Sequence, residues 1–419
     1  IQPAFAMTRP ALLSLDDALP QLLAQAQVLT GVQSVSTFEA DGRVLAQDVV
    51  AALQVPPQDN SSMDGYALRA TDCAQAGAVL RVTQRIPAGT YGTQLNAGEA
   101  ARIFTGAPIP PGADAVVMQE DCEALEGEHV KVNKAVPAGQ WVRRSGEDVT
   151  RGATVLTQGT RLTPAELGLA ASIGLAQLQV SARPRVALFS TGDELVMPGD
   201  VAPEAMPAGA IYNSNRFFLR AMLQRLGCEV TDLGIVPDKR DATIAALRDA
   251  ALHHDLILTS GGVSVGEEDH IKPAVESLGE LNLWQLAIKP GKPFAYGKVN
   301  REAQADACHF MGLPGNPVSS FVTFLLLVRP FVLALQGVTK TDITRTDMTA
   351  HFDWPRADKR REFLRVKRNA QGGLDLFPNQ SSGVLTSAVW GDGVVDNPAG
   401  QTISKGDTVR FISFAEWLA

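Results

Sequence analysis

Between residues 183 and 331, short apolar segments alternate with amphipathic segments of helical length, and this alternation constrains the fold more than any other feature. The apolar segments RVALFS, EVTDLGIV and DLILTS have the length of strands, and residues 213–227 and 241–254 have the pattern of helices. Strands that alternate with helices of about 10–15 residues predict a parallel sheet with helices on both faces. Ligands of such sheets bind at the carboxyl ends of the strands.

Two of these predicted strands end in small residues with acidic residues close by. Small residues let a ligand approach the backbone, and free N–H groups at the start of a following helix bind phosphate. A tight turn alone would explain one such segment, but two segments at the same sheet edge favour a polar ligand. The candidate binding residues are Ser190, Thr191, Gly192 and Asp193 after the first strand, and Ser260, Gly261 and Gly262 after the second.

A third candidate segment, GLPGNPVSS at 312–320, combines a rigid turn with the start of a long apolar stretch. A helix that begins here with Asn and Ser side chains would add hydrogen-bond donors for an anionic group. A plain capped turn explains the pattern equally well. The candidate binding residues are Pro314, Gly315, Asn316 and Ser319.

Lys289 and Lys292 flank a Pro-Gly turn in the segment LAIKPGKPFAYG. Most lysines are solvated surface charges, and that is the default interpretation of each. Their position in the sequence between two glycine-containing segments of one sheet favours contact with a bound anion.

Carboxylates beside a phosphate-binding segment need an explanation, because they would repel the ligand. At about 4 Å and an effective dielectric constant of about 20, each like-charge pair costs roughly 4 kcal/mol. A divalent cation between the groups removes this cost, and Mg²⁺ takes one or two carboxylates together with phosphate oxygens and water. The candidate metal ligands are Glu194, Asp238 and Asp269, whereas Glu267 and Glu268 are interpreted as solvated charges.

The rest of the chain contains a β-rich region between two predicted helices. Residues 79–148 are rich in Val, Ile, Gly and Pro in short runs, which predicts strands and turns. Helical patterns at 14–29 and 162–175 flank this region, so we expect it to be inserted into another domain. Beyond about residue 340, segments such as GDTVRFISF predict a small sandwich or barrel.

Composition and motif searches exclude several classes of function. A net charge of -8 argues against general nucleic-acid binding, and the basic segment 359–368 is interpreted as a strand with one charged, solvated face. The Cys and His spacings match no zinc site, and four widely separated cysteines fit a reducing cytoplasm. Arg329 and Pro330 interrupt the apolar stretch 318–335, so we expect a buried helix that ends or kinks there and no membrane span. The first residues contain no pattern typical of a signal peptide.

Seven segments in this order resemble the molybdopterin molybdenumtransferase family, which includes bacterial MoeA and the E domain of gephyrin. They are DNSSMDGYALRA, RIFTGAPIPPGADAVVMQE, RRSGEDV, ALFSTGDEL, LILTSGGVSVGEEDH, LAIKPGKPFAYGK and GLPGNPVSS. Any one of them could arise by chance, but seven in register between residues 59 and 320 are very specific. The resemblance extends from about residue 14 to the C-terminus.

This resemblance implies an elongated protomer of four domains and a homodimer. The domains would be a discontinuous helical first domain (7–53 and 149–182), an inserted β-rich domain (54–148), a MogA-like α/β domain with a parallel sheet (183–331) and a C-terminal β-barrel (340–419). The active cleft would join the α/β domain of one subunit to the β-rich domain of the other. Transient partners would be the adenylyltransferase and the maturation factors of molybdoenzymes, with no nucleic acid or membrane.

The resemblance also implies the reaction. Adenylylated molybdopterin and molybdate are the substrates, the adenylyl pyrophosphate bond is cleaved with Mg²⁺, and AMP and molybdenum cofactor are the products. Lysines beside the site would offset the repulsion between molybdate and the phosphorylated pterin. The implied catalytic positions are Asp64, Thr105, Asp148, Glu194, Asp238, Asp269 and Lys289, with Ser382 in NQSSG as a further binding residue.

One position departs from the family pattern. Gln285 stands in the segment WQLAIKP, where the family carries a lysine, so an uncharged hydrogen-bonding group replaces a cation beside the expected anion site.

Two alternative functions are compatible with parts of the sequence. The adenylyltransferase that makes the adenylylated pterin shares the α/β domain with its TSGG and LPGNP segments, but that enzyme needs neither the inserted β-rich domain nor the barrel. A non-enzymatic cofactor carrier or scaffold is the other alternative, although the long linker and extra domain of gephyrin have no counterpart in this sequence. We therefore expect a cytoplasmic molybdenum insertase.

Overall fold

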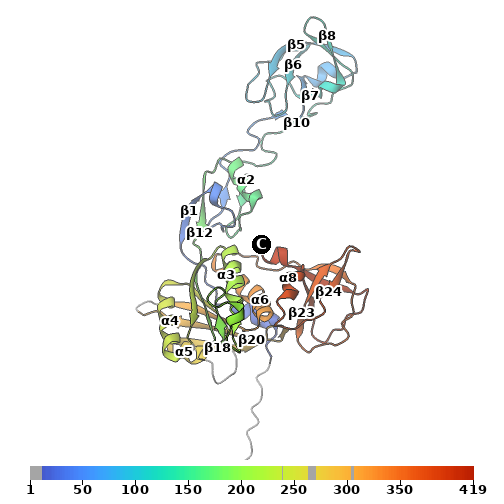
Figure 1. The fold of residues 1–419 in the computed structure, drawn as a ribbon. Coiled ribbons are helices and arrows are strands. Elements are labelled where there is room, and N and C mark those ends of the chain that lie inside the picture. Colours follow the sequence, from blue (N-terminus) through green and yellow to red (C-terminus); the bar gives the residue numbers. More distant parts are fainter. Residues whose placement is uncertain (1–11, 238, 263–269, 303–305) are drawn as a thin grey trace, which may run out of the picture.

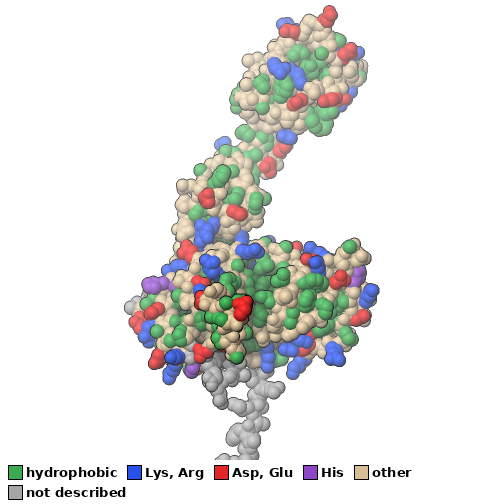
Figure 2. Space-filling view, viewed as in Figure 1, with side chains coloured by type: hydrophobic (Ala, Val, Ile, Leu, Met, Phe, Trp, Pro, Cys, Tyr) green, Lys and Arg blue, Asp and Glu red, His purple; other side chains and the backbone are tan. Residues whose placement is uncertain are grey.

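The computed structural model describes residues 12–237, 239–262, 270–302 and 306–419. Its described part is elongated (Figure 1): an α/β unit (residues 183–335) and a barrel (340–419) lie side by side at one end. A small middle unit (31–53 and 149–182) leads from this base to a β-rich unit (54–148) at the far end. The space-filling surface is hollowed between the middle unit and the base (Figure 2). The predicted multidomain α/β and β architecture is confirmed.

The α/β unit is built on a six-stranded sheet in the order β16-β13-β17-β21-β20-β18. The first four strands are parallel, as predicted, whereas β20 and β18 are antiparallel to their neighbours. The sheet is therefore mixed, because β18, β20 and β21 follow one another without the helical crossover that parallel neighbours need. The strands are β13 (Arg185–Thr191), β16 (Glu229–Val236), β17 (Leu256–Ser260), β18 (Gly279–Gln285), β20 (Pro293–Asn300) and β21 (Ala307–Leu313), with a separate pair β14 (Leu195–Val196) and β15 (Ile211–Tyr212).

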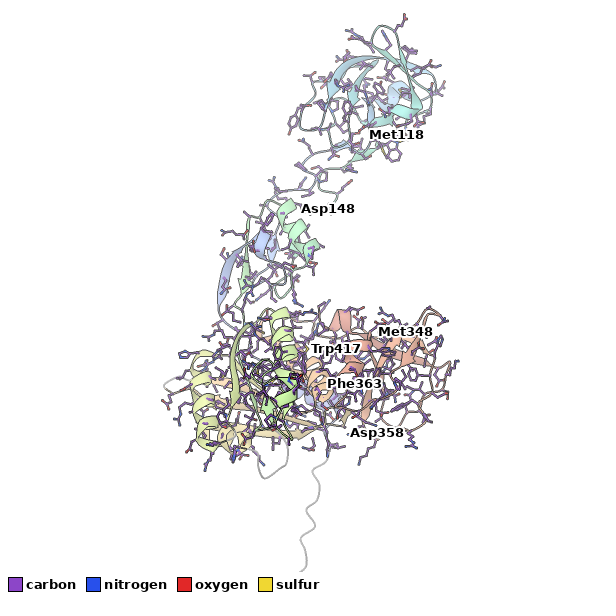
Figure 3. The ribbon with its side chains drawn as sticks, in the orientation of Figure 1. Met118, Asp148, Met348, Asp358, Phe363 and Trp417 are labelled. Atoms are coloured by element: carbon purple, nitrogen blue, oxygen red, sulfur yellow. The ribbon has the colours of Figure 1, made fainter. Side chains whose placement is uncertain are left out.

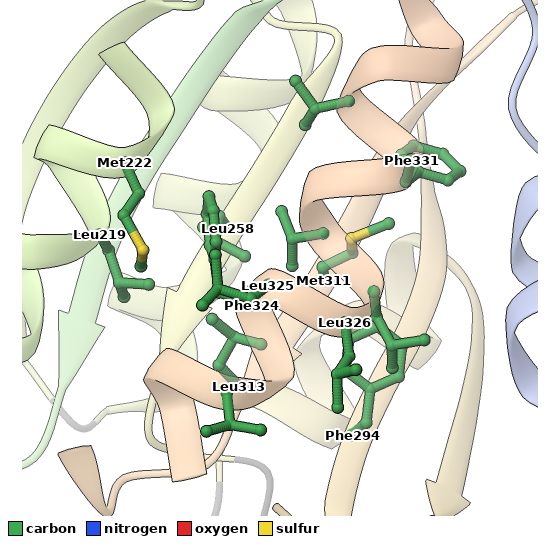
Figure 4. Close-up of a cluster of buried hydrophobic side chains, with 14 of the residues drawn as sticks. Leu219, Met222, Leu258, Phe294, Met311, Leu313, Phe324, Leu325, Leu326 and Phe331 are labelled. Carbon is green, nitrogen blue, oxygen red and sulfur yellow. The ribbon is translucent and has the colours of Figure 1, made fainter. Parts of the chain in front are cut away.

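Alternate residues of the central strands point to opposite faces of this sheet and fill two different cores. On one face, Leu188 and Leu258 pack with α3 (Asn215–Arg225) and with the long helix that follows β21 (Figure 4). On the other face, Phe189 and Ile257 pack with α4 (Arg240–His253) and α5 (Ile271–Leu278). The strand and helix predictions for this region are confirmed.

The long apolar helix runs without interruption from Pro317 to Leu335. It consists of α6 (Pro317–Thr323), a π-helical stretch (Phe324–Val328) and α7 (Arg329–Leu335). We expected the helix to end or kink at Arg329 and Pro330. An end there is wrong, because the wider π turn accommodates a proline that cannot donate to the preceding turn. By length and composition this helix could cross a membrane, but 83% of its most apolar window is buried inside the protein, as in a core helix.

The first described helix, α1 (Leu15–Leu23), begins as predicted after Ser14, whose hydroxyl accepts from the Asp17 N–H. It ends several residues earlier than the sequence pattern suggested. Leu15 and Leu22 belong to the same core as Leu188 and Leu258, so this helix packs on the α/β unit rather than on the middle unit.

The middle unit consists of segments that precede and follow the β-rich unit in the chain. β1 (Val32–Ser36) pairs with β12 (Gln177–Ser181), and β2 (Val49–Val50) pairs with β11 (Thr154–Leu156). The helix α2 (Pro164–Ser172) begins with a capping box between Thr163 and Glu166. Because strands from before and after the β-rich unit pair with each other, that unit is an insertion in space as well as in sequence.

The β-rich unit contains a six-stranded sheet in the order β7-β4-β6-β5-β9-β8 and has cores of its own. A two-stranded ribbon joins it to the middle unit. The sheet strands are β4 (Gly65–Leu68), β5 (Ala78–Ile86), β6 (Glu99–Ile103), β7 (Ala115–Met118), β8 (Cys122–Leu125) and β9 (His129–Val132), and the ribbon strands are β3 (Asn60–Ser61) and β10 (Val142–Arg143).

Five C-terminal strands close into a barrel, because β23 pairs with both β24 and β25. The main core of the α/β unit continues into Phe363 and Trp417 of the barrel, which lie at the junction in Figure 3, so these two units pack as one body. The elements are β22 (Thr346–Ala350), β23 (Arg361–Arg368), β24 (Gly373–Leu376), α8 (Thr386–Trp390), β25 (Gly393–Asn397), β26 (Thr408–Ser413) and α9 (Phe414–Trp417), and β19 (Ile288–Lys289) of the α/β unit pairs with β23.

The basic segment 359–368 does not form the solvated strand face that we expected. Arg365 is only 1% exposed, and Arg361 forms an ion pair with the buried Asp396 at 2.6 Å between Nε and Oδ1. The interpretation was wrong at these two residues because β23 is covered on both sides, by the barrel core and by the neighbouring α/β unit.

Candidate active site

Three small-residue segments meet at one edge of the sheet of the α/β unit. β13, β17 and β21 are neighbouring parallel strands, and Ser190 is directly opposite Ser260, which is directly opposite Leu313. The segments that follow these residues therefore start side by side. The backbone N–H of Gly261 donates to the carbonyl of Leu313 at 3.0 Å, which ties the second segment to the third.

The backbone conformation and the packing of the second segment both require its glycines. Gly261 and Gly262 have φ values of +87° and +67°, which side chains rarely adopt. A Cβ at Gly262 would lie 2.5 Å from Ile271 Cδ1 and 2.9 Å from Thr191 Oγ1. The bare backbone here thus allows the loops after β13 and β17 to pack against each other.

Gly315 in the third segment differs from these glycines. A Cβ at this position would meet no atom within 4 Å, its φ lies outside the left-handed region, and the residue is exposed. Nothing in the described fold requires a glycine here. The open space above Gly315 is therefore the part of this edge that a ligand can occupy.

Asn215, at the start of α3, was not predicted to belong to this site. Its Nδ2 donates to Ser260 Oγ at 2.7 Å and to the Gly315 carbonyl at 2.8 Å, so it joins the second and third segments. Its position at a helix start in the segment NSN was the available signal.

Several buried polar atoms at this end of the unit have no hydrogen-bond partner in the described chain, among them those of Ser190 and Asn213. Ser190 Oγ lies at the end of β13 in a residue that is 1% exposed, and Asn213 Nδ2 precedes α3 in a residue that is 2% exposed. Buried polar groups are nearly always hydrogen-bonded, so these two atoms can bind a ligand.

The barrel brings the predicted Ser382 to the third segment. The backbone N–H of Val318, in the first turn of α6, donates to the Ser382 carbonyl at 2.9 Å. Arg365, which sequence reasoning did not select, donates from Nη2 to the neighbouring Ser381 carbonyl at 3.3 Å. Burial lowers the pKa of Arg365 to about 10. Through this hydrogen bond, the buried Arg365 side chain holds the Ser381–Ser382 segment in position.

The lysine turn packs against the start of the long helix, because a Cβ at Gly291 would lie 2.3 Å from Thr323 Oγ1. Lys292 is exposed on this turn. Lys289 points to the barrel instead, with Nζ 3.1 Å from Glu362 Oε1 and 3.3 Å from Asp358 Oδ2. In the described chain, therefore, carboxylates already pair with the charge of Lys289, whereas Lys292 is available to an anion.

The Asp358 carboxylate of this pair is held in its ionised form. A side-chain hydrogen bond from Arg360 holds the pKa of Asp358 well below its usual value, and Lys289 adds to this effect. The ion pair thus anchors the lysine turn to the barrel.

One of the three predicted metal ligands lies in the described structure. The Glu194 carboxylate folds back over Gly192, where a Cβ would lie 2.6 Å from Glu194 Oε2, and Asp193 beside it is exposed. Asp238 and Asp269 lie outside the described residues. Among the residues that are described, no group of three acidic, His or Cys side chains could hold a metal ion. Carboxylate oxygen is the donor that Mg²⁺ prefers, so Glu194 fits that ion as a single ligand.

The predicted residues Asp64 and Thr105 contact each other on the β-rich unit. The backbone N–H and the hydroxyl of Thr105 both donate to Asp64 Oδ1, each at 2.8 Å. These two hydrogen bonds lower the pKa of Asp64. The pair therefore presents an ionised carboxylate at the surface of the unit.

Asp148 lies where the β-rich unit joins the middle unit (Figure 3). Its side chain is exposed, and the preceding loop is fixed by an ion pair between Arg144 and Asp59 with 2.7 Å between Nη1 and Oδ2. Within one chain, the β-rich unit lies at the opposite end of the molecule from the α/β unit (Figure 1). Within one chain, the structure thus keeps the Asp64–Thr105 pair and Asp148 apart from the predicted residues at the sheet edge.

The α/β unit that carries this sheet edge is similar to a class of pterin-binding domains. Its residues 187–334 match the family model "Probable molybdopterin binding domain". Residues 13–174 match the "MoeA N-terminal region (domain I and II)", and residues 347–414 match the "MoeA C-terminal region (domain IV)".

Two curated proteins named molybdopterin molybdenumtransferase are similar over most of the chain. The protein of Haemophilus influenzae is 41% identical over 326 residues, 78% of each chain, and that of Synechococcus elongatus is 36% identical over 95% of this chain and 98% of its own. The crystal structure of the molybdopterin biosynthesis MoeA protein from Pyrococcus horikoshii superposes with a TM-score of 0.83 at 28% identity, over 96% of this chain and 100% of that chain. The chain belongs to the molybdopterin molybdenumtransferase family.

Proposed function

We propose that this protein inserts molybdenum from molybdate into adenylylated molybdopterin, with release of AMP and molybdenum cofactor. The observation that carries this proposal is the meeting of three small-residue segments, Lys292 and the Ser382 segment at one sheet edge. Such an edge offers backbone N–H groups and a cation to a ligand that carries phosphates. Membership of a family of transferases supports the same reaction.

The residues of the edge have separate tasks in this proposal. The bare backbone at Gly315 admits the pterin phosphate, and the Ser190 hydroxyl and Asn213 Nδ2 donate hydrogen bonds to its oxygens. Lys292 lowers the repulsion between molybdate and the phosphates. Lys289 holds the lysine turn against the barrel through Glu362.

The reaction breaks the P–O–P bridge between the adenylyl phosphorus and the pterin phosphate. A water oxygen attacks the adenylyl phosphorus, the bond from this phosphorus to the bridging oxygen breaks, the pterin phosphate is the leaving group, and the adenylyl group is released as AMP. Glu194, together with Asp238 and Asp269, would hold Mg²⁺, which when bound stabilises the negative charge on phosphoryl oxygens. The ionised Asp64 would accept a proton from the nucleophile. Its lowered pKa keeps the carboxylate ionised and ready to accept this proton, although the same lowered pKa makes Asp64 a weaker base.

We propose further that the protein is a homodimer with a cleft shared between subunits. The Asp64 group and the glycine-containing edge lie at opposite ends of one chain, so a second copy is needed to bring them together. A cytoplasmic location, the domain division at residues 53, 148, 182 and 340, and transient contacts with the adenylyltransferase and with maturation factors are part of this proposal.

The test of the reaction uses the full chain with adenylylated molybdopterin and Mg²⁺. We expect AMP release that depends on molybdate, and we expect Asp269→Asn to abolish it while the circular dichroism spectrum stays unchanged. Adenylylated pterin accumulating from molybdopterin and ATP would instead identify an adenylyltransferase, and pterin binding without any AMP release would identify a carrier.

The test of the shared cleft mixes two inactive variants, Asp64→Asn and Lys292→Ala. When the two variants are mixed in equal amounts, about half of the dimers contain one subunit of each kind, and one of the two clefts in such a dimer has no substitution. Activity should therefore return to about 25% of wild type. A mixture that stays as inactive as its components, although mixed dimers are shown by mass spectrometry, contradicts the shared cleft.

A further inference from the structure

An open cavity on the surface of the β-rich unit contains residues to which the proposed function gives no role. Its volume is about 500 Å³, and its lining includes Tyr66, Arg85, Arg102, Glu128 and His129. Small-molecule sites typically have volumes of about 300–1,000 Å³ and a few convergent polar groups. The cavity therefore has the size and the lining of a ligand site.

Three of the lining side chains form a row across neighbouring strands. Tyr66 of β4 is directly opposite Arg102 of β6, which is directly opposite Arg85 of β5. Neighbouring like charges on one sheet face repel each other. Neither arginine forms an ion pair within the described ranges, even though Glu128 also lines the cavity. A bound anion would remove this repulsion.

Aromatic rings hold the two guanidinium groups in place. The guanidinium carbons of Arg85 and Arg102 each lie 4.5 Å from the centre of the Phe104 ring, and that of Arg102 lies 5.3 Å from the centre of the Tyr66 ring. Guanidinium groups oriented in this way can donate to phosphate oxygens and stack on planar rings.

The hydrogen-bond donors of the two arginines are used differently. Arg102 donates from Nη1 to the Gly65 carbonyl at 2.8 Å and from Nη2 to Gln119 Oε1 at 2.5 Å. The side chain of Arg85 makes no hydrogen bond in the part of the chain that the structure describes. Arg85 therefore has its donors available, and Arg102 supplies a fixed charge.

We propose that this cavity binds the adenylyl half of the substrate, with the phosphate on Arg85 and Arg102 and the adenine ring stacked on a guanidinium plane. The proposal rests on the proposed function, which places an adenylyl group next to Asp64. The geometry agrees, because Thr105 follows Phe104 in the chain and Gly65, which accepts from Arg102, follows Asp64. After cleavage the same cavity holds AMP until it leaves.

The test measures AMP binding to the full chain by calorimetry. Loss of charge-assisted hydrogen bonds to phosphate should raise the Kd for AMP at least about tenfold in Arg85→Gln, and adenosine should bind wild type weakly. The matched control is Arg81→Gln, an exposed arginine of the same strand that does not line the cavity, and it should change the Kd less than about twofold. An unchanged Kd in Arg85→Gln overturns the proposal.

Parallel assays separate this proposal from the proposed function. If the wild-type protein binds AMP and the Arg85→Gln variant does not, but the wild-type protein never inserts molybdenum, the cavity is a nucleotide site and the proposed reaction is wrong. If wild type inserts molybdenum and Arg85→Gln binds AMP normally and releases it at the wild-type rate, the reaction stands and the cavity assignment fails. Arg85→Lys, which keeps the charge, should recover part of the affinity.

Discussion

In the proposed function, the glycine-containing edge of the α/β unit and the exposed face of the β-rich unit would bind anions in different ways. The edge is formed mainly by backbone, at the ends of three buried strands whose register brings Ser190, Ser260 and Leu313 together. The β-rich face uses side chains instead, with Arg85 and Arg102 on neighbouring strands and Asp64 held by Thr105. A backbone site is rigid but carries little charge, and a side-chain site supplies the charge that the first one lacks.

The two regions also differ in how they are supported. The edge belongs to a core that continues from α1 through the long helix into the barrel, whereas the β-rich unit has small cores of its own. Because no core residue is shared between them, each half of the proposed cleft can be perturbed without the other.

The largest effect on activity is expected from valine substitutions at two glycines of the edge. Gly262→Val introduces strain and a clash with Ile271, so it should reduce both activity and stability, the latter by about 1–3 kcal/mol. The Cβ of Gly315→Val would meet no atom of the described chain within 4 Å, so thermal unfolding should stay within about 0.5 kcal/mol of wild type, yet pterin phosphate affinity should fall more than about tenfold. Normal affinity in Gly315→Val would remove this segment from the site.

The second prediction concerns the separate cores. Phe331 is fully buried in the large core, and Phe331→Ala should destabilise the α/β unit and barrel by about 3–5 kcal/mol. Val130→Ala, at a fully buried position of the β-rich unit, should lower a different calorimetric transition by about 1–2 kcal/mol. A single transition that both variants shift equally would show that the two regions unfold together.

A third prediction tests the electrostatics of the β-rich face. The Thr105 hydrogen bonds lower the pKa of Asp64, so Asp64 stays ionised until the pH falls to this lowered value. Thr105→Val removes the hydroxyl donor, the pKa of Asp64 rises, and the acid limb of the pH–rate profile should move to higher pH. Thr71→Val, at an exposed threonine of the same unit that does not line the cavity, is the control and should leave the profile unchanged. A profile that does not move in Thr105→Val would mean that Asp64 does not control this limb.

The smallest effect is expected at Gln285, which is paired with Pro293 next to the lysine turn. Gln285→Lys adds a cation close to Lys292, so it should lower the molybdate concentration for half-maximal rate by about two- to fivefold, as expected for a partly screened charge. The measurement is the AMP release rate over a molybdate series at fixed ionic strength. An unchanged half-maximal concentration places position 285 outside the anion site.

The sequence predicted the α/β alternation and the three loop segments, because each depends on residues that are contiguous in the chain. For the C-terminal region the residue pattern left a sandwich and a barrel open, and only the resemblance implied the barrel. The sequence did not predict that β20 and β18 make the sheet mixed, that the long helix passes through Pro330, or that Arg365 is buried. These features depend on neighbours from other parts of the chain. The metal assignments at Asp238 and Asp269, which lie outside the described residues, and the domain boundaries stay predictions.

Local sequence by itself determined where the backbone is bare and where helices begin, since small side chains and capping residues act on their own chain neighbours. Only the tertiary structure decided which of these places meet. It brought Asn215 and Ser382 to the sheet edge, turned Lys289 toward Glu362, and placed Asp64 at the far end of the molecule. The physical reason is that strand register and core packing join residues that lie far apart along the chain, and no short segment carries that information.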